Sequence, residues 1–286
     1  MRKLSIVSIF ILSILSLNMS AQGGDQKDLE IDFQKINRAV SFGIGHANVF
    51  DTYLSPQEYK GIDFRVSRES IRMTNRIQNT SIQNFIEANI SYTNNYADNN
   101  NSFSGMFKWN YGMHYQFHLT PNFKLLAGGL LDANLGFIYN LRNGNNPASA
   151  KAYLNLTASG MAIWHTKIKN YPMVLRYQIN VPLLGMMFSP HYGQSYYEIF
   201  SVGNSSNILN FTSLHNQPSF RQYLTIDLPI RQSTIRISYV ADIQQSKLQQ
   251  IKTHYYTHSF MVGFVHNLFK LRNKPVDAKN KHLNAY

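Results

Sequence analysis

Apolar and polar residues alternate along most of this chain, and the clearest run lies at residues 103–119. Seven apolar or aromatic residues fall on every second position there, with polar residues and glycine between them. Successive side chains of a β-strand point to opposite faces of a sheet, so the run predicts a strand with one apolar face. That face contains Phe107, Trp109, Tyr111, Met113, Tyr115, Phe117 and Leu119, opposite Lys108, Asn110, Gly112, His114, Gln116 and His118.

Shorter segments repeat this alternation, and ten strands can be placed. Beyond residue 17, no stretch is apolar over the ~20 residues that a membrane-spanning helix needs. Lipid outside a closed barrel and water inside it explain both faces, so the pattern predicts an all-β, antiparallel transmembrane β-barrel. The strands are placed around residues 40–45, 62–67, 86–92, 103–119, 131–137, 153–159, 173–181, 223–228, 235–239 and 256–269.

Residues 185–217 decide the number of strands. The composition of residues 195–200 (SYYEIF) and the turn of Gly, Asn and Ser at 203–206 favour a further hairpin, with strands at 194–202 and 207–214. This interpretation predicts twelve strands. If the stretch is one long extracellular loop, the barrel has ten, and both numbers are even, as in bacterial single-chain barrels.

The connections between strands differ in length. Short turns at residues 120–122, 169–170 and 229–231 alternate with longer links at 49–60, 94–102 and 140–149. All three short turns fall on one side of the predicted barrel. Membrane barrels have short periplasmic turns and longer extracellular loops, so the pattern also predicts the orientation.

The ends of the chain carry a different signal. Arg2 and Lys3 precede the apolar run at residues 4–17, and small and polar residues follow up to Ala21. This is the order of a secretory signal peptide, and the run is too short to span a bilayer. We expect a signal peptide at 1–21 cleaved near Ala21, with a retained anchor as the alternative. A polar lead-in at 22–36, the barrel at 37–269 and a basic periplasmic tail at 270–286 then follow.

Composition narrows the function classes. The 286 residues include no cysteine, which excludes disulfides, thiolate catalysis, cysteine-bound zinc and a lipid-modified cysteine. Lys and Arg total 27 against 15 Asp and Glu, and the net charge is +12. In an exported barrel this excess indicates an anionic membrane surface or a basic lumen, so we expect no nucleic-acid partner.

The polar face of the predicted strands carries charges of both signs. Within a narrow lumen they must pair or remain hydrated, because an isolated buried charge is costly. We expect Arg65, Arg176 and Arg236 to meet carboxylates of this polar face, at least two of the three within ~4 Å, and so to close the lumen; a narrow pore for small solutes is the alternative. The charged positions are Asp63, Arg65, Glu69, Glu87, Lys108, Asp132, Arg176, Asp227, Arg236 and Asp242.

Other polar residues are candidates for chemistry. His114, Gln116 and His118 share one strand face and predict hydrogen-bonded lumen residues, since a metal site would need an added carboxylate. We therefore expect no metal and no cofactor. A lipid-acting enzyme remains a second alternative, with Ser55, His46 and Asp51, or His191 and Ser195, as candidates. No Gly-x-Ser-x-Gly motif occurs, so no catalytic residue is assigned.

Two segments have a distinctive composition: residues 48–61 (NVFDTYLSPQEYKG) and 189–200 (SPHYGQSYYEIF). With the signal peptide and the alternation, they resemble a family of predicted outer-membrane β-barrel proteins of Gram-negative bacteria without an assigned function. The resemblance implies a barrel and its location, and no catalytic residues. The two segments hold Tyr53, Tyr59, Tyr192, Tyr196 and Tyr197, which predict an aromatic belt at the outer interface or, alternatively, a surface for a sugar or a partner.

Together these patterns favour an integral outer-membrane barrel with a structural or surface-binding role and a charge-paired lumen. Its expected partners are outer-membrane lipid and the barrel-assembly machinery. A surface glycan or a surface protein is a further candidate partner.

Overall fold

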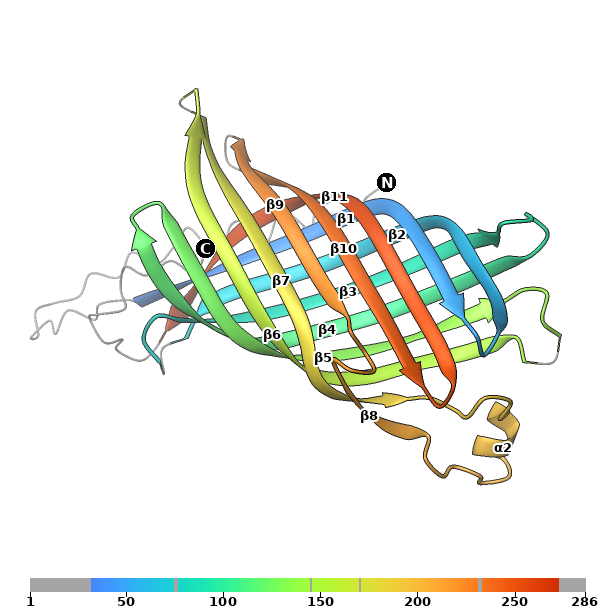
Figure 1. The fold of residues 1–286 in the computed structure, drawn as a ribbon. Helices are drawn as coiled ribbons and strands as arrows, with labels where there is room; N and C mark the ends of the chain where they lie inside the picture. Colours follow the sequence, from blue (N-terminus) through green and yellow to red (C-terminus); the bar gives the residue numbers. More distant parts are fainter. Residues whose placement is uncertain (1–31, 75–76, 145, 170, 231–232, 273–286) are drawn as a thin grey trace, which may run out of the picture.

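The chain folds into a closed antiparallel β-barrel (Figure 1). The computed structural model describes residues 32–74, 77–144, 146–169, 171–230 and 233–272. The strands are β1 (Asp32–Asp51), β2 (Ser55–Met73), β3 (Thr80–Asn95), β4 (Asn101–Thr120), β5 (Phe123–Asn140), β6 (Ala148–Ile168), β7 (Tyr171–Phe188), β8 (Leu209–Ser213), β9 (Phe220–Ile230), β10 (Ser233–Leu248) and β11 (Ile251–Arg272), and a short helix, α2 (Tyr196–Phe200), precedes β8. Within the described ranges, no helix is long and apolar enough to cross a membrane.

Ten of these strands form the ring. β1 pairs with β2 on one side and with β11 on the other, and β7 pairs with β9. β8 lies outside the ring, because it pairs only with the end of β7, over Leu184–Phe188. The predicted all-β antiparallel barrel is thus confirmed with the ten-strand alternative, and the prediction of twelve strands is wrong.

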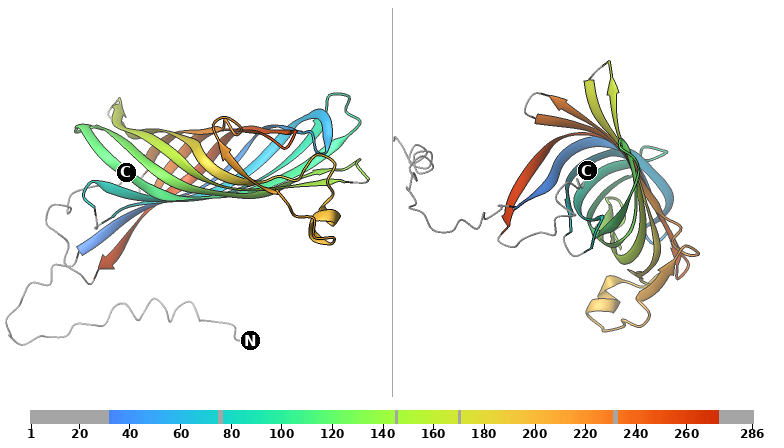
Figure 2. Two further views of the ribbon diagram at one scale, coloured as in Figure 1. Left: turned by 60° about the horizontal axis from the view of Figure 1, so that its bottom comes forward. Right: turned by 90° about the vertical axis from the view of Figure 1, so that its left-hand side faces the viewer.

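The error comes from a helix in the stretch that composition assigned to a strand. Ser195 Oγ accepts a hydrogen bond from Glu198 N at 3.2 Å, and Glu198 Oε2 accepts one from Ser195 N at 2.9 Å. This reciprocal capping box starts α2. Residues 207–214 do contain a strand, β8, but its partner is β7. Figure 2 shows α2 outside the barrel wall.

The ladder between β7 and β9 stops at the pair Asn180 and Arg221. Pro182 follows two residues later, and a proline has no N–H to donate to a neighbouring strand. Beyond it, β7 continues with β8 as its new neighbour. The proline therefore lies where the neighbour of β7 changes from β9 to β8.

The ends of the barrel follow from the strand order. Asp32 and Arg272 begin β1 and end β11 at one end, named here the terminal end. The connections β2–β3, β4–β5, β6–β7 and β9–β10 lie there, as expected for the short turns. The opposite loop end has the β1–β2 turn at residues 52–54, so the long link predicted at 49–60 is wrong. The connections at 96–100 and 141–147 are also shorter than expected.

The paired region extends past its predicted bounds of 37–269. β1 begins at Asp32, inside the predicted lead-in, and β11 ends at Arg272, inside the predicted tail. The predicted signal peptide, the rest of the lead-in and residues 273–286 of the tail lie outside the described residues.

An apolar belt surrounds the outside of the barrel. On β1 the outward residues Val40, Phe42 and Ile44 are exposed, with Phe42 at 62%. On β2 the belt lies between the outward residues Lys60 and Arg68. These are eight residues apart, which at ~3.3 Å per residue and a tilt of ~40° gives a height of about 20 Å. Membrane barrels carry a band of about 25 Å, so the belt has a suitable height for lipid.

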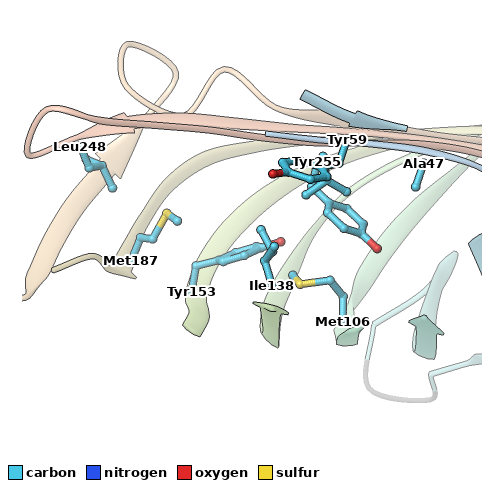
Figure 3. Packing of buried hydrophobic residues seen from close by; sticks show 9 residues of the cluster. Ala47, Tyr59, Met106, Ile138, Tyr153, Met187, Leu248 and Tyr255 are labelled. Atoms are coloured by element: carbon cyan, nitrogen blue, oxygen red, sulfur yellow. The ribbon is translucent and has the colours of Figure 1, made fainter. Parts of the chain in front are cut away.

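Buried apolar side chains fill three layers of the lumen among the described residues. The terminal layer and the middle layer are small, whereas the layer at the loop end is larger and includes three tyrosines (Figure 3). The terminal layer is Ile71, Leu126, Met161 and Ile163; the middle layer is Phe85, Tyr223, Val240 and Met261; the outer layer is Ala47, Val49, Tyr59, Met106, Ile138, Tyr153, Met187, Leu248 and Tyr255.

Candidate functional site

Two clusters of charged side chains separate the apolar layers. On β2, the inward residues run from Ile71 in the terminal layer through Glu69, Arg65 and Asp63 to Tyr59 in the outer layer. On β3, Phe85 of the middle layer lies between Gln83 and Glu87. The lumen therefore alternates between apolar and charged layers along the barrel.

The terminal-side cluster consists of Glu69, Arg176, Asp227 and Arg236. Arg236 donates to both oxygens of Asp227, from Nε and Nη2, at 2.7 Å each. Glu69 accepts from Arg176 Nη1 at 2.8 Å and from Arg236 Nη1 at 2.5 Å. Two guanidinium groups thus meet two carboxylates, and the cluster is electrically neutral.

The loop-side cluster is larger. Arg65 Nη1 lies 2.7 Å from Glu87 Oε1, and Arg65 Nη2 lies 3.3 Å from Asp63 Oδ2. Lys108 forms an ion pair with Asp242. The side chains of Arg65, Asp63 and Glu87 are 0% exposed. Such burial requires full pairing, because an uncompensated charge in this environment costs several kcal/mol.

Arg221 completes this cluster and was not among the predicted residues. It forms an ion pair with Glu87, and its Nε lies 4.0 Å from Asp242 Oδ2. Its guanidinium also covers the rings of Phe85 and Tyr223 of the middle layer, 5.3 and 4.7 Å from their centroids. With Arg221 the cluster has three cations and three carboxylates, so it is neutral as well.

Asp132 differs from the other predicted charges. Its Oδ1 accepts from Asn110 Nδ2 at 2.5 Å and from Asn134 Nδ2 at 2.7 Å. Across the described ranges, no cation lies within 4.0 Å of it in an ion pair. The asparagine amides therefore satisfy this carboxylate without neutralising it.

Two cavities in the lumen are water-sized. One cavity of about 30 Å³ lies beside Asp132, Asn155 and Thr157, and another of about 30 Å³ lies beside Met106, Lys151 and Tyr255. A cavity of this size holds one or two waters. Both side-chain polar atoms of Asn155 lack a partner within the described part of the chain, which is consistent with ordered water there.

The three predicted polar residues of β4 separate into two groups. His114 is buried in the lumen, and its Nε2 lies 2.8 Å from Ser159 Oγ. Gln116 is also buried, and its Nε2 lies 3.3 Å from Met73 Sδ. His118 has the parity of these two inward residues but is exposed at the terminal end. In the part of the chain that the structure describes, no three His, Asp or Glu residues are placed to hold a metal ion.

The first set of candidate catalytic residues is divided between the two faces of the barrel wall, although Asp51 lies opposite Ser55 in the β1–β2 ladder. His46 faces outward on β1, whereas Asp51 faces inward, with its Oδ2 2.7 Å from Lys151 Nζ. Ser195 is occupied as the N-cap of α2. The Asp51–Lys151 ion pair at the loop end was not predicted, although Lys151 has the parity of the inward residue Tyr153.

The five tyrosines of the two distinctive segments occupy different environments. Tyr59 is buried in the lumen, where its hydroxyl accepts from Asn100 and Asn140 at 2.8 and 3.0 Å. The prediction of an outer-belt position is therefore wrong for Tyr59. Tyr192 and Tyr197 are exposed in the loop around α2.

Tyr53 and Tyr196 bring the two segments into contact. The Tyr53 hydroxyl donates to Gln194 O at 2.7 Å, and the two tyrosine rings meet edge to face at 5.8 Å. Tyr196 accepts at its hydroxyl from Ala150 N at 2.6 Å. Burial, aided by the nearby Tyr196, Asp51 and Glu198, raises the pKa of Tyr53 to about 12. Tyr53 is therefore a neutral donor, and the loop around α2 is fixed to the barrel rim.

Solved structures similar to this chain are outer-membrane barrels. The outer membrane protease OmpT from Escherichia coli is 6% identical with a TM-score of 0.51, over 85% of this chain and 100% of the protease. The translocator domain of the autotransporter NalP from Neisseria meningitidis is 9% identical with a TM-score of 0.39, over 82% and 88%. The transport unit of the autotransporter AIDA-I from Escherichia coli is 8% identical with a TM-score of 0.39, over 84% and 92%.

The likeness to the protease shows a shared fold, which is that of an outer-membrane barrel. None of the curated proteins matches the chain. A family model described as a protein of unknown function, DUF3316, matches residues 7–275. Because this match spans nearly the whole sequence, the chain belongs to the DUF3316 family.

Proposed function

We propose that this protein is a closed outer-membrane barrel that has a structural role and presents a fixed loop for binding at the cell surface. The two neutral charge clusters are the observation that carries the proposal. A conducting pore needs a hydrated path and benefits from charges that attract the permeant ion. Here each arginine of the lumen clusters is neutralised by a carboxylate, and three apolar layers lie above, between and below the clusters.

The loop around α2 supports the surface-binding part of the proposal. Tyr53 and Tyr196 anchor it, while Tyr197 and Phe200 are 70% and 72% exposed. Exposed rings on a fixed loop lose little conformational entropy on binding, which favours a glycan or a protein partner. In this proposal the loop end faces the outside of the cell, and the signal peptide is removed near Ala21.

Planar-bilayer recording tests the closed lumen. We expect no conductance steps from the mature wild-type protein. The matched variant replaces Arg65, Glu87, Lys108 and Asp242 by Ser, which removes two cations and two carboxylates and leaves the net charge unchanged. Because the terminal-side cluster and the three apolar layers remain in this variant, any conductance should appear there and not in wild type, and faster migration of unheated samples on gels verifies that both proteins are folded. Conductance steps from folded wild-type protein would overturn the proposal.

Binding to arrayed surface glycans and to candidate surface proteins tests the loop. Replacement of Tyr192, Tyr197 and Phe200 by Ser should abolish the binding that wild-type protein shows. Tyr96→Ser is the control, because Tyr96 is a fully exposed tyrosine of the β3–β4 connection. Equal losses in both variants would indicate nonspecific ring contacts and contradict a site at α2.

A further inference from the structure

Three arginines form a group on the outside of the barrel, separate from the lumen clusters. Arg38 lies on β1, and Arg68 and Arg72 lie on β2. Ser70 is the β2 residue directly opposite Arg38, so the two β2 arginines flank that position at two residues on either side. Diagonal neighbours of this kind are ~7–8 Å apart. The three guanidinium groups can therefore reach a single point above Ser70.

This group has no neutralising partner in the described part of the chain. Among the described residues, no carboxylate lies within 4.0 Å of Arg38, Arg68 or Arg72. The Nε atom of Arg38 is buried and has no hydrogen-bond partner within the same ranges. The arginines of the two lumen clusters, by contrast, are all paired with carboxylates. Like charges on adjacent positions repel, so an anion from outside the described part of the chain would stabilise the outward group.

The position of the group indicates where that anion comes from. Val40 on β1 and Val66 on β2 are the first exposed apolar residues of the belt, each two residues from an arginine of the group. The group thus lies at the terminal edge of the belt, where the hydrocarbon of a bilayer gives way to headgroups. His266 of β11, directly opposite Arg38, is exposed at the same edge.

We propose that Arg38, Arg68 and Arg72, with the Ser70 hydroxyl, bind the phosphate of an anionic glycerophospholipid in the leaflet at the terminal end. A guanidinium group presents a planar set of donors that matches phosphate oxygens. A lipid fits better than free phosphate, because its acyl chains would continue from the phosphate onto the belt at Val40, Phe42 and Val66. The cluster carries three cations without a carboxylate, which favours a net negative headgroup over a zwitterionic one.

Native mass spectrometry of retained lipids tests the site. Mature protein is refolded into vesicles of phosphatidylglycerol and phosphatidylcholine in equal amounts with identical acyl chains, and is then released in mild detergent. Wild type should retain phosphatidylglycerol in preference to phosphatidylcholine. The variant R38Q/R68Q/R72Q should show a preference for phosphatidylglycerol at least about tenfold lower than that of wild type, since one basic residue at an anionic surface contributes roughly a fivefold factor. The single variant Arg68→Gln should lose about fivefold.

The matched control is R142Q/K247Q/K252Q, which removes three exposed cations at the loop end. It should retain phosphatidylglycerol as wild type does. Equal losses in both triple variants would show a general effect of net charge and would overturn the proposed site. A wild type without headgroup preference would overturn it as well. If an excess of inorganic phosphate displaces the lipid, the arginines bind a free anion and the proposal of a lipid ligand is wrong.

Discussion

The Tyr53 hydroxyl donates a hydrogen bond to the Gln194 carbonyl oxygen at 2.7 Å across 141 positions of sequence. It joins the β1–β2 turn to the loop that precedes α2. The Tyr196 ring packs against Tyr53 in the same contact. One side-chain hydroxyl thereby holds the largest connection at the loop end against the barrel rim.

This contact should respond to pH only under strongly alkaline conditions. An unfolded tyrosine has a pKa near ~10, whereas burial raises the pKa of Tyr53 to about 12. Because the folded-state pKa is the higher one, the contribution of Tyr53 is fully present below pH ~10 and is lost as the pH rises through about 12. The ultraviolet titration of wild type minus that of Tyr53→Phe should show one group with a midpoint near 12; a midpoint near ~10 would contradict the docked loop.

Breaking the terminal-side cluster should be costly. Glu69→Gln removes the carboxylate that Arg176 and Arg236 share, so we expect a loss of about 3–5 kcal/mol in the free energy of unfolding. Urea unfolding of wild type and variant in vesicles measures this change in the free energy of unfolding. The control is Glu58→Gln, because Glu58 is exposed and its pair with Lys60, at 3.6 Å, contributes about 1 kcal/mol or less. Similar losses in both variants would mean that the lumen is hydrated.

The contact between the outward side chains and lipid can be tested at the middle of the belt. Phe42→Arg should destabilise the barrel by about 2–4 kcal/mol, because the guanidinium would enter the hydrocarbon. Asn48→Arg, on the same face of β1 beyond the belt, should cost about 0–1 kcal/mol. The difference in urea midpoint between the two variants is the measurement. Equal costs would show that the belt does not contact lipid.

Closure of the ring depends on a glycine. A Cβ atom at Gly45 would lie 2.1 Å from His258 O and 2.6 Å from Ser259 Cα on β11. Gly45→Ala must therefore displace the backbone of β11, at a cost of about 1–3 kcal/mol or more. The folded fraction on unheated gels should fall. Gly144→Ala, which meets nothing within 4 Å, should leave the folded fraction unchanged; a normal folded fraction for Gly45→Ala would place the closing contact elsewhere.

Alternation was sufficient to predict both faces of β4. Phe107 to Leu119 point outward at every second position, and Lys108, Asn110, His114 and Gln116 are buried in the lumen. Continued past the ends of the predicted strands, the same parity places Tyr59 and Arg221 in the lumen. Both residues were missed because the predicted strands at 62–67 and 223–228 begin too late to include them.

Other features could not be read from alternation. The Ser195 and Glu198 spacing is a helix-start signature, but the aromatic composition of residues 195–200 outweighed it. Partners such as Arg236 and Glu69, 167 positions apart, depend on strand register and on which strands face each other across the lumen. A period-two pattern specifies neither, because every strand shares the same period.

The distribution of the lumen charges along the chain bears on how the barrel assembles. Strands β2–β5 supply three carboxylates and two cations of these clusters, and Asp132 in addition, whereas β7, β9 and β10 supply three arginines and two carboxylates. We therefore expect these two groups of strands, which have opposite net charge in the lumen, to attract each other before the ring closes. The seam between β1 and β11 is lined inside by Gly45, Thr257 and Ser259, without a charged group at these positions. The final zipping of β11 onto β1 can thus proceed in lipid after the charges have already found their counterparts.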